Sequence, residues 1–244
     1  MLDFLYSIGI IPAFFLFFIE NLIIILGVVA IGFAIQKKID RKAQFIISGK
    51  EYMFALLTLV INTLVTFAGF LMWRYHWIDF DTSFSWKIGL DCVVLFLVMD
   101  SAMYILHVII HHSIFYKPVH GLHHDYTKPS PIDLFVLNPL ETFSFGSLWL
   151  ILITLYTSNI YAVVMYLTLN VVFGMLGHLS VEPFPKNWMK IPVLNYICTS
   201  TFHYLHHKEE KYNFGFYTIL WDKLFGTLSP HYKEQFLLEK EKQQ

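Results

Sequence analysis

The sequence predicts an all-α protein: a multi-pass membrane helical bundle of about three spanning helices and a helical hairpin, with a cytosolic, histidine-rich helical cap. Of the 244 residues, 56% are hydrophobic and only 14% are charged, whereas a soluble domain keeps about a quarter of its residues charged. The apolar residues gather in runs long enough to cross a bilayer as helices. Ten of the twelve histidines fall in four short clusters, which begin at the end of the third run.

Three of the apolar runs are predicted to span the membrane. They are residues 10–35, residues 53–73 and residues 86–110. As helices that rise about 1.5 Å per residue, all three could cross about 30 Å of hydrocarbon. A fourth stretch, residues 145–176, is interrupted by the polar residues 157–159. It predicts a hairpin of two helices of about fifteen residues each, which enter the membrane without fully crossing it.

Positive charges predict the orientation of these helices. The connection between the first two runs contains five lysine and arginine residues, whereas the next connection contains only Arg74 and Lys87. Because the more positive side of a membrane protein is the cytosolic one, we expect the histidine clusters to face the cytosol. This topology suits a bacterial inner membrane. It suits the endoplasmic reticulum equally well. Residues 240–244 also fit the K-x-K-x-x pattern of a retrieval signal for that compartment.

The chain reads as a single unit. Neither an internal repeat nor a linker divides it, so we expect one integral membrane domain over residues 1–244. Residues 229–244 form a polar tail, which is expected to fray from Glu234 onward. The net charge of −1, without a concentration of basic residues, excludes a nucleic-acid partner.

The histidines have the spacing of metal ligands. His107 and His111 lie four residues apart, so a helix projects both rings from one face toward one ion. An unusual H-x-x-H-H pattern occurs at residues 120–124 and again at residues 203–207. In each box the first two histidines are expected to share a face, and the third to diverge toward a neighbouring ion or a hydrogen bond. With His178 closing the ring of ligands, the pattern fits two metal ions, or one site built from both halves.

The residues missing from these clusters narrow the choice of metal. No cysteine falls within them, and Val, Ile and Ile separate His107 from His111, so the H-E-x-x-H signature of zinc peptidases is absent. An all-imidazole site large enough for two ions suits iron, with zinc as the alternative. Iron with open coordination positions activates dioxygen as a co-substrate. Dioxygen chemistry in turn suits an apolar substrate without a polar group at the reacting carbon.

The order of these motifs resembles the fatty acid hydroxylase superfamily, also called the sterol desaturase family. The resemblance covers residues 86–228, and it includes Asn213-Phe-Gly215 and Trp221-Asp-Lys-Leu-Phe-Gly-Thr227 after the last histidine box. It implies an integral-membrane, non-haem di-iron oxidoreductase that hydroxylates or desaturates a C–H bond of a fatty-acyl, sterol or related lipid. Carried over by position, the implied metal ligands are His107, His111, His120, His123, His124, His178, His203, His206 and His207.

Three carboxylates are further candidates for the catalytic site. Asp100, Glu182 and Asp222 lie near the clusters in sequence, where a carboxylate could fix the tautomer of a ligand imidazole. Helix capping or solvation explains these three residues equally well. Phe202 is a departure from the resemblance, because sterol-modifying relatives often have a histidine just before the last box.

The chain is expected to need an external electron donor, because it contains no G-x-G-x-x-G turn and no haem-attachment motif. A ferredoxin- or cytochrome-type partner could dock on lysines near the clusters, although the positive-inside excess explains them equally well. These lysines are Lys186, Lys190, Lys208 and Lys211. Two other functions fit the pattern: another lipid reaction on the same scaffold, such as ether or aldehyde cleavage, and a non-catalytic membrane protein that binds or transports lipid.

Overall fold

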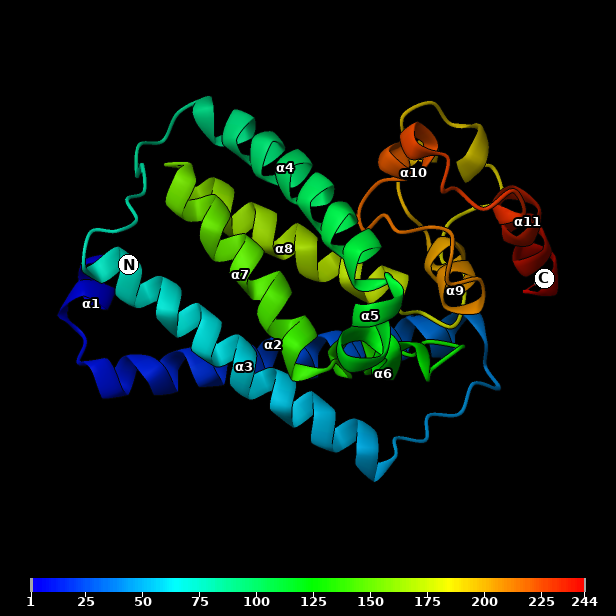
Figure 1. The fold of residues 1–244 in the computed structure, drawn as a ribbon, viewed down its shortest axis with the longest axis horizontal. Coiled ribbons are helices and arrows are strands. Elements are labelled where there is room, and N and C mark those ends of the chain that lie inside the picture. The colour runs from blue at the N-terminus through cyan, green and yellow to red at the C-terminus, as the bar shows by residue number, and fades with distance from the viewer. Residues whose placement is uncertain (1, 244) are drawn as a thin grey trace.

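The computed structural model describes residues 2–243, and its named elements are all helices (Figure 1). Four of them are long and apolar enough to cross a membrane, as expected of an integral membrane protein. These four are α2 (Ile10–Ile39), α3 (Gly49–Arg74), α4 (Lys87–Ile110) and α8 (Ile160–Gly177). The three predicted spans are therefore confirmed. The predicted hairpin consists of α7 (Pro139–Leu155) and α8, but α8 is itself long enough to be a fourth span.

Local signals set where two of these helices begin. At the start of α3, the Ser48 side chain accepts from Glu51 N, and Glu51 Oε2 accepts from Ser48 N, which makes a capping box. α7 begins six residues before the apolar stretch that predicted it. The side chain of Asn138 accepts a hydrogen bond from Leu140 N, and Pro139 takes the first helical position. A polar first turn is thus added to an apolar helix.

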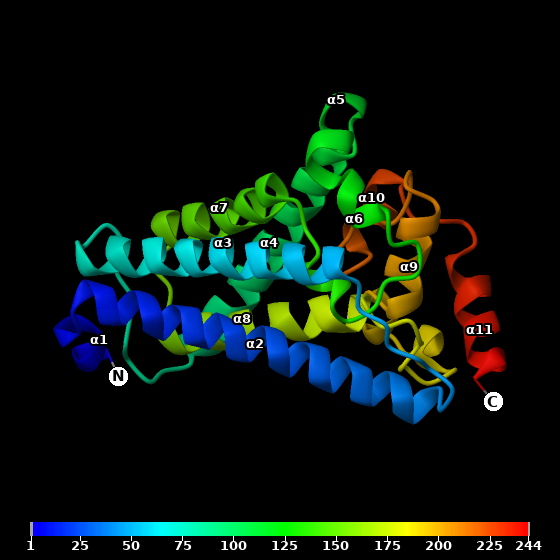
Figure 2. The ribbon, with the colours of Figure 1, turned by 90° about the horizontal axis from the view of Figure 1, so that it is seen from below.

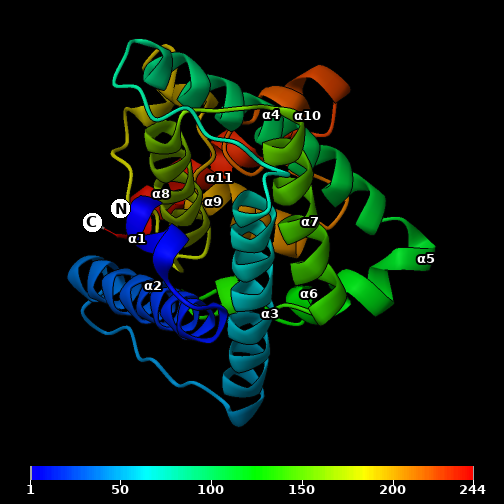
Figure 3. The same ribbon diagram turned by 90° about the vertical axis from the view of Figure 1, so that its left-hand side faces the viewer.

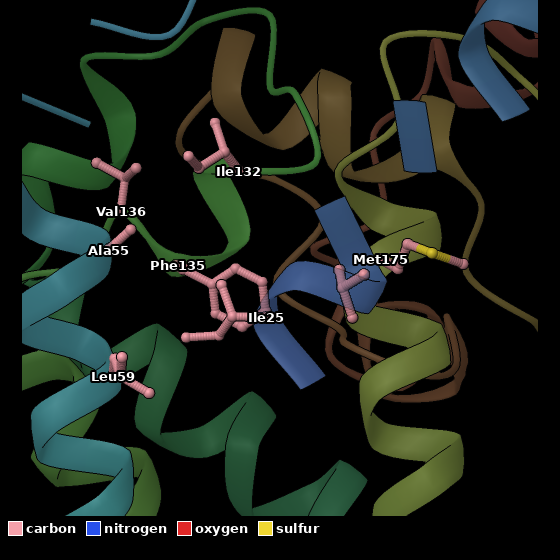
Figure 4. Close-up of a cluster of buried hydrophobic side chains, with 8 residues drawn as sticks. Ile25, Ala55, Leu59, Ile132, Phe135, Val136 and Met175 are labelled. Carbon is pink, nitrogen blue, oxygen red and sulfur yellow. The ribbon is translucent and has the colours of Figure 1, made fainter. Parts of the chain in front are cut away.

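The consecutive helices α7 and α8 share α4 as a neighbour but differ in their other contacts within the bundle. α7 contacts α3 and α4, whereas α8 contacts α4 and α2. One apolar core joins α2, α3 and α8 with the short helix η2 (Asp133–Phe135), as Figure 4 shows for Leu59, Phe135 and Met175. A second core lies among α4, α7 and α8. Figure 3 shows the bundle from the end at which α1 (Leu2–Ser7) lies.

The remaining helices gather at one end of the bundle, opposite α1, and form the cap (Figure 2). Between α4 and α7 come short elements, of which α5 projects sideways (Figures 2 and 3). They are α5 (Ser113–Phe115), the π-helical turn η1 (Tyr116–His120), α6 (Gly121–His124) and η2. After α8 come η3 (Trp188–Lys190), η4 (Leu194–Tyr196), α9 (Ser200–Lys208), α10 (Leu220–Phe225) and α11 (Tyr232–Lys242).

The predicted frayed tail is wrong for the described residues, because Tyr232–Lys242 form the helix α11. Phe236 is fully buried, and Tyr232 packs against α9 with its ring centroid 5.4 Å from that of Phe202. Lys240 Nζ donates to the carbonyl oxygen of Glu182 over 2.8 Å. These contacts stabilise α11, although its composition alone predicts a solvent-exposed segment. Gln244 lies outside the described residues.

Candidate metal centre

The nine histidines named above come together in the cap. They form two groups, and within each group the ligand nitrogens all lie within 4.8 Å of one another. The first group contains His107, His111, His120, His124 and His206. The second group contains His123, His178, His203 and His207. His112, next to His111 in the chain, belongs to neither group and is exposed.

Each histidine box contributes to both groups, but not by the expected division. In α9, His203 and His207 share the second group, and His206 belongs to the first. In the other box, the first and last histidines likewise share a group, and the middle one, His123, joins the other. Residues four apart on a helix differ by only about 40° in direction, whereas residues three apart differ by about 60°. The first and third histidines of a box therefore converge, and the middle one diverges.

Hydrogen bonds to oxygen fix the tautomer of four ligand candidates. His107 Nδ1 lies 2.8 Å from Phe214 O, and His206 Nδ1 lies 2.7 Å from Tyr212 O. His178 Nδ1 lies 2.8 Å from the carbonyl oxygen of Gly174, one turn earlier in α8. A carbonyl oxygen can only accept, so Nδ1 must carry the proton in all three rings. Their Nε2 atoms are therefore left with a bare lone pair, which is the form that binds a metal.

The fourth such histidine pairs with a carboxylate. His120 Nδ1 lies 2.7 Å from Glu141 Oε1, and both side chains are 2% exposed. Glu141 is in the first turn of α7, which the cap of Asn138 places beside the histidine box. In its ionised form the Glu141 carboxylate can only accept, so it holds the proton of His120 on Nδ1 and leaves Nε2 bare.

The Nε2 atoms of the ligand candidates face one another. His107 Nε2 lies 3.1 Å from His120 Nε2, although neither of them has a proton to donate. In the second group, His203 Nε2 lies 3.2 Å from His178 Nε2 and 3.0 Å from His207 Nε2. Lone pairs in such contact repel unless a cation lies among them. The buried Nε2 of His111 has no hydrogen-bond partner among the described residues. This donor set fits metal ions.

Burial keeps the imidazoles of the cap neutral. It lowers the pKa of His124 and of His178 to about 4. For His206 and His207, burial lowers the pKa well below the usual value of histidine, and neighbouring imidazoles lower it further. Neutral imidazole is the ligand form of histidine, so these side chains can bind a metal at neutral pH without first losing a proton.

The three candidate carboxylates have partners other than the imidazoles. Asp100 accepts from Tyr217 N over 2.9 Å and from the side chains of Thr218 and Trp221. Asp222 accepts from Phe214 N and Gly215 N, each over 2.8 Å. Within residues 2–243, neither carboxylate makes a hydrogen bond to a histidine. The expectation that they fix imidazole tautomers directly is wrong, because loop amides occupy their oxygens. Asp222 instead stabilises the backbone turn at Phe214, whose carbonyl oxygen accepts from His107 Nδ1.

Glu182 similarly supports a ligand helix from a distance. Its Oε2 accepts from the backbone N and the hydroxyl of Thr201, over 3.0 and 2.7 Å, in the first turn of α9. A carboxylate at this end of a helix pairs with free N–H groups and with the positive end of the helix dipole. Glu182 thereby anchors the helix that carries three of the histidines.

Comparison with known proteins agrees with this geometry. Residues 92–227, which include both histidine boxes, match the family described as fatty acid hydroxylase. The protein belongs to the fatty acid hydroxylase family. Methylsterol monooxygenase 1 of Danio rerio is 27% identical over 61% of this chain and 50% of its own length. Methylsterol monooxygenase 1 of Gallus gallus is 25% identical over 79% of this chain and 62% of its own length. Protein CER1-like 2 of Arabidopsis thaliana is 30% identical over 51% of this chain but only 21% of its own length.

The matches thus span about half the length of the curated methylsterol monooxygenases. No solved structure matches the chain.

In this member of the fatty acid hydroxylase family, Glu141 is a residue of the site that the sequence did not predict. Its signal in the sequence is a lone acidic residue in the first turn of an apolar helix, after the box at residues 120–124. That position is equally typical of a carboxylate that only pairs with a helix N-terminus. The carbonyl acceptors of Gly174, Tyr212 and Phe214 leave no signal at all, because every residue has a carbonyl group.

Proposed function

We propose that this protein is a lipid-modifying oxidoreductase. It uses dioxygen at a di-iron centre held by the two histidine groups, and it hydroxylates or desaturates a C–H bond of a fatty-acyl, sterol or related lipid. One observation carries the proposal: nine imidazoles converge at one end of a bundle of apolar helices, and four of them have Nε2 bare for a metal. When bound, two irons with open positions supply the activation of dioxygen.

The chain itself supplies orientation and an apolar surrounding. The Phe216 ring lies between the first group and the bundle, with its centroid 5.1 Å from that of His107 and 5.2 Å from that of Phe145. Phe145 and Phe216 also pack on the core formed by α4, α7 and α8. An apolar wall on this side excludes water from the reacting region and favours an apolar substrate. The names of the methylsterol monooxygenases support an oxygenation of a lipid.

We further propose that the cap faces the cytosol and that a ferredoxin- or cytochrome-type protein delivers electrons there. The excess of lysine and arginine between α2 and α3, at the cap end, supports this orientation. Lys211 Nζ lies 5.1 Å from the ring centroid of Tyr212, whose carbonyl accepts from His206. A positive charge beside the residue that holds His206 supports docking of an acidic carrier on this face. The membrane would be a bacterial inner membrane or the endoplasmic reticulum.

The test combines metal analysis with lipid chemistry. The purified protein, loaded with ferrous iron, is given a reductant, labelled dioxygen and the total lipid of its own membrane. We expect two irons per chain and either a hydroxylated lipid that contains label or a new double bond. The variants His120→Ala and His206→Ala should lose the product, whereas His231→Ala, at an exposed position outside both groups, should retain it.

Two results would contradict the proposal. Stoichiometric zinc without iron-dependent activity would favour another lipid reaction on the same scaffold. An unchanged lipid composition in cells that carry the His120→Ala variant in place of the original chain would favour a non-catalytic lipid-binding or transport protein.

A further inference from the structure

The helix α10 and the loop beside it carry an exposed apolar surface that the metal centre does not use. It contains Leu220, Leu224 and Phe225 of α10, together with Val193 and Tyr196 from the loop at η4. Leu224 and Phe225 are 66% and 61% exposed, and Val193 is 77% exposed. Apolar side chains gathered in this way on one surface indicate a contact with lipid or with another protein.

The surface is a continuous unit. Ile219 N donates to Tyr196 O over 2.8 Å, which ties the start of α10 to η4. The ammonium group of Lys223 lies 3.8 Å from the ring centroid of Tyr196. A lysine can leave its apolar stem in lipid while its charged end reaches the headgroups. Tyrosine is also common in the interfacial layer of a membrane.

Two contacts place α10 beside the C-terminal turns of α4, which is one of the candidate membrane spans. The ring of Phe225 stacks on that of Tyr104, with centroids 5.6 Å apart and planes at 14°. Trp221 Nε1 donates to Asp100 Oδ2 over 3.1 Å. Tyr104 and Asp100 come six and ten residues before Ile110, the last residue of α4. At 1.5 Å per residue, they lie about 9 and 15 Å along the helix from its end. α10 therefore lies beside the last turns of a spanning helix (Figure 1).

Near the residues that contact α10, α4 also has exposed apolar side chains. Ile105, next to Tyr104, is 52% exposed, and Val108 is 39% exposed. In a spanning helix, exposed apolar side chains of this kind contact acyl chains. The same environment is thus available to the exposed side chains of α10 at that level.

We propose that α10 and residues 193–196 are seated in the bilayer and contact acyl chains of the leaflet next to the cap. The partner of this surface is lipid, and α10 is an interfacial helix rather than part of a water-exposed cap. The helix also contains Asp222, which holds the backbone turn at Phe214 whose carbonyl meets His107. One ligand of the first group is thereby linked to a membrane-seated element. The inference does not depend on the proposed reaction.

A spin label at Leu224→Cys tests this placement in the full protein, reconstituted in vesicles of phosphatidylcholine and phosphatidylglycerol. Its collision rate is measured with oxygen, which concentrates in lipid, and with a water-soluble nickel complex. Ile105→Cys is the lipid-facing control and Lys233→Cys is the water-facing control. Cys92 and Cys198 are both buried, and the unsubstituted protein gives the labelling blank.

We expect the label at residue 224 to resemble that at residue 105: high oxygen access, low nickel access, and a depth of about 5–10 Å below the headgroups. Nickel access equal to that at residue 233 would overturn the proposal, since the surface would then face water. Low access to both reagents would also overturn it, because protein would cover the surface. A second label at Leu220→Cys, on the same surface, must give the same result as residue 224.

Discussion

Glu141 Oε1 accepts a hydrogen bond from His120 Nδ1 over 2.7 Å, and both side chains are almost completely buried. The pair joins the first turn of α7 to the box at residues 120–124. A carboxylate in this position orients the ring of His120, leaves its Nε2 free for a metal, and strengthens it as a ligand. Among the described residues, Glu141 is the carboxylate that does this directly in the first group.

Replacement of Glu141 should therefore weaken metal binding more than it weakens the fold. We expect Glu141→Leu to lower iron affinity by about 10- to 100-fold. Glu141→Gln keeps an oxygen acceptor near His120 Nδ1, so it should lose less of the iron affinity than Glu141→Leu. Iron titrations of the purified protein measure both effects. The matched control is Glu234→Gln, an exposed glutamate of α11, and equal affinity in all of these variants would contradict the assigned role.

The two histidine groups predict two separable metal ions. At saturating iron, we expect His111→Ala to lower bound iron from two to about one per chain, and His203→Ala to do the same through the other group. Chelation should also lower the melting temperature, because a ligand at a hundred times its Kd contributes about 2.7 kcal/mol to the folded state. Metal analysis and thermal unfolding check both effects. A melting temperature that chelation leaves unchanged would count against a metal in this site.

Asp133 predicts a pH dependence of stability that is independent of the metal ligands. Its carboxyl group is 2% exposed, Oδ1 has no hydrogen-bond partner among the described residues, and burial raises its pKa from 3.8 to about 6. Since the folded pKa is the higher one, its contribution to stability is fully present below about pH 3.8 and is lost as the pH rises through about 6.

Asp133→Asn removes this titration. As the pH rises from 4 to 7, we expect the unfolding free energy of the variant to increase by up to about 3 kcal/mol relative to that of the unsubstituted protein. Above pH 7 this difference should stay constant. Denaturation at several pH values measures the difference. Asp40→Asn, at an exposed aspartate, should show no such trend, and a difference that is constant with pH would refute the assignment.

A histidine at position 202 should not create a tenth metal ligand. Phe202 is fully buried, and it packs against Cys198, Ile219 and Tyr232 in a small core between α9 and α11. We expect Phe202→His to leave the iron content unchanged and to destabilise the fold by about 2 kcal/mol or more, because it buries a polar ring without a partner. Metal analysis and thermal unfolding of the variant distinguish these outcomes from the gain of a ligand.

Hydropathy and histidine spacing predicted the features that arise within one helix or one box. The spans α2, α3 and α4 are long, predominantly apolar runs, and His107 and His111 share a helical face, so both features were accessible to sequence reasoning. The start of α7 at Pro139 could not be predicted from the apolar pattern, because the first turn of this helix is polar. α11 was missed because its stability comes from its packing against α9, which is distant in sequence, and from the burial of Phe236.

The partners of the histidines were the least predictable part. Asp100 and Asp222 were singled out because they lie near the clusters in sequence, yet both bind backbone amides of the loop at residues 214–218. Glu141, which does reach an imidazole, is 21 residues from His120. Contacts between such distant residues depend on how helices pack, and a single sequence contains no record of that packing.

Each histidine box supplies ligands to both groups, and this division affects how the metal centre assembles. Neighbours in the chain, His123 with His124 and His206 with His207, point to different groups, and the rings of His124 and His207 stack with centroids 4.6 Å apart. A first ion that rigidifies one group therefore also aligns the backbone of the other and lowers the entropy lost when the second ion enters. Iron uptake should be cooperative, with few chains that hold a single ion at intermediate iron supply.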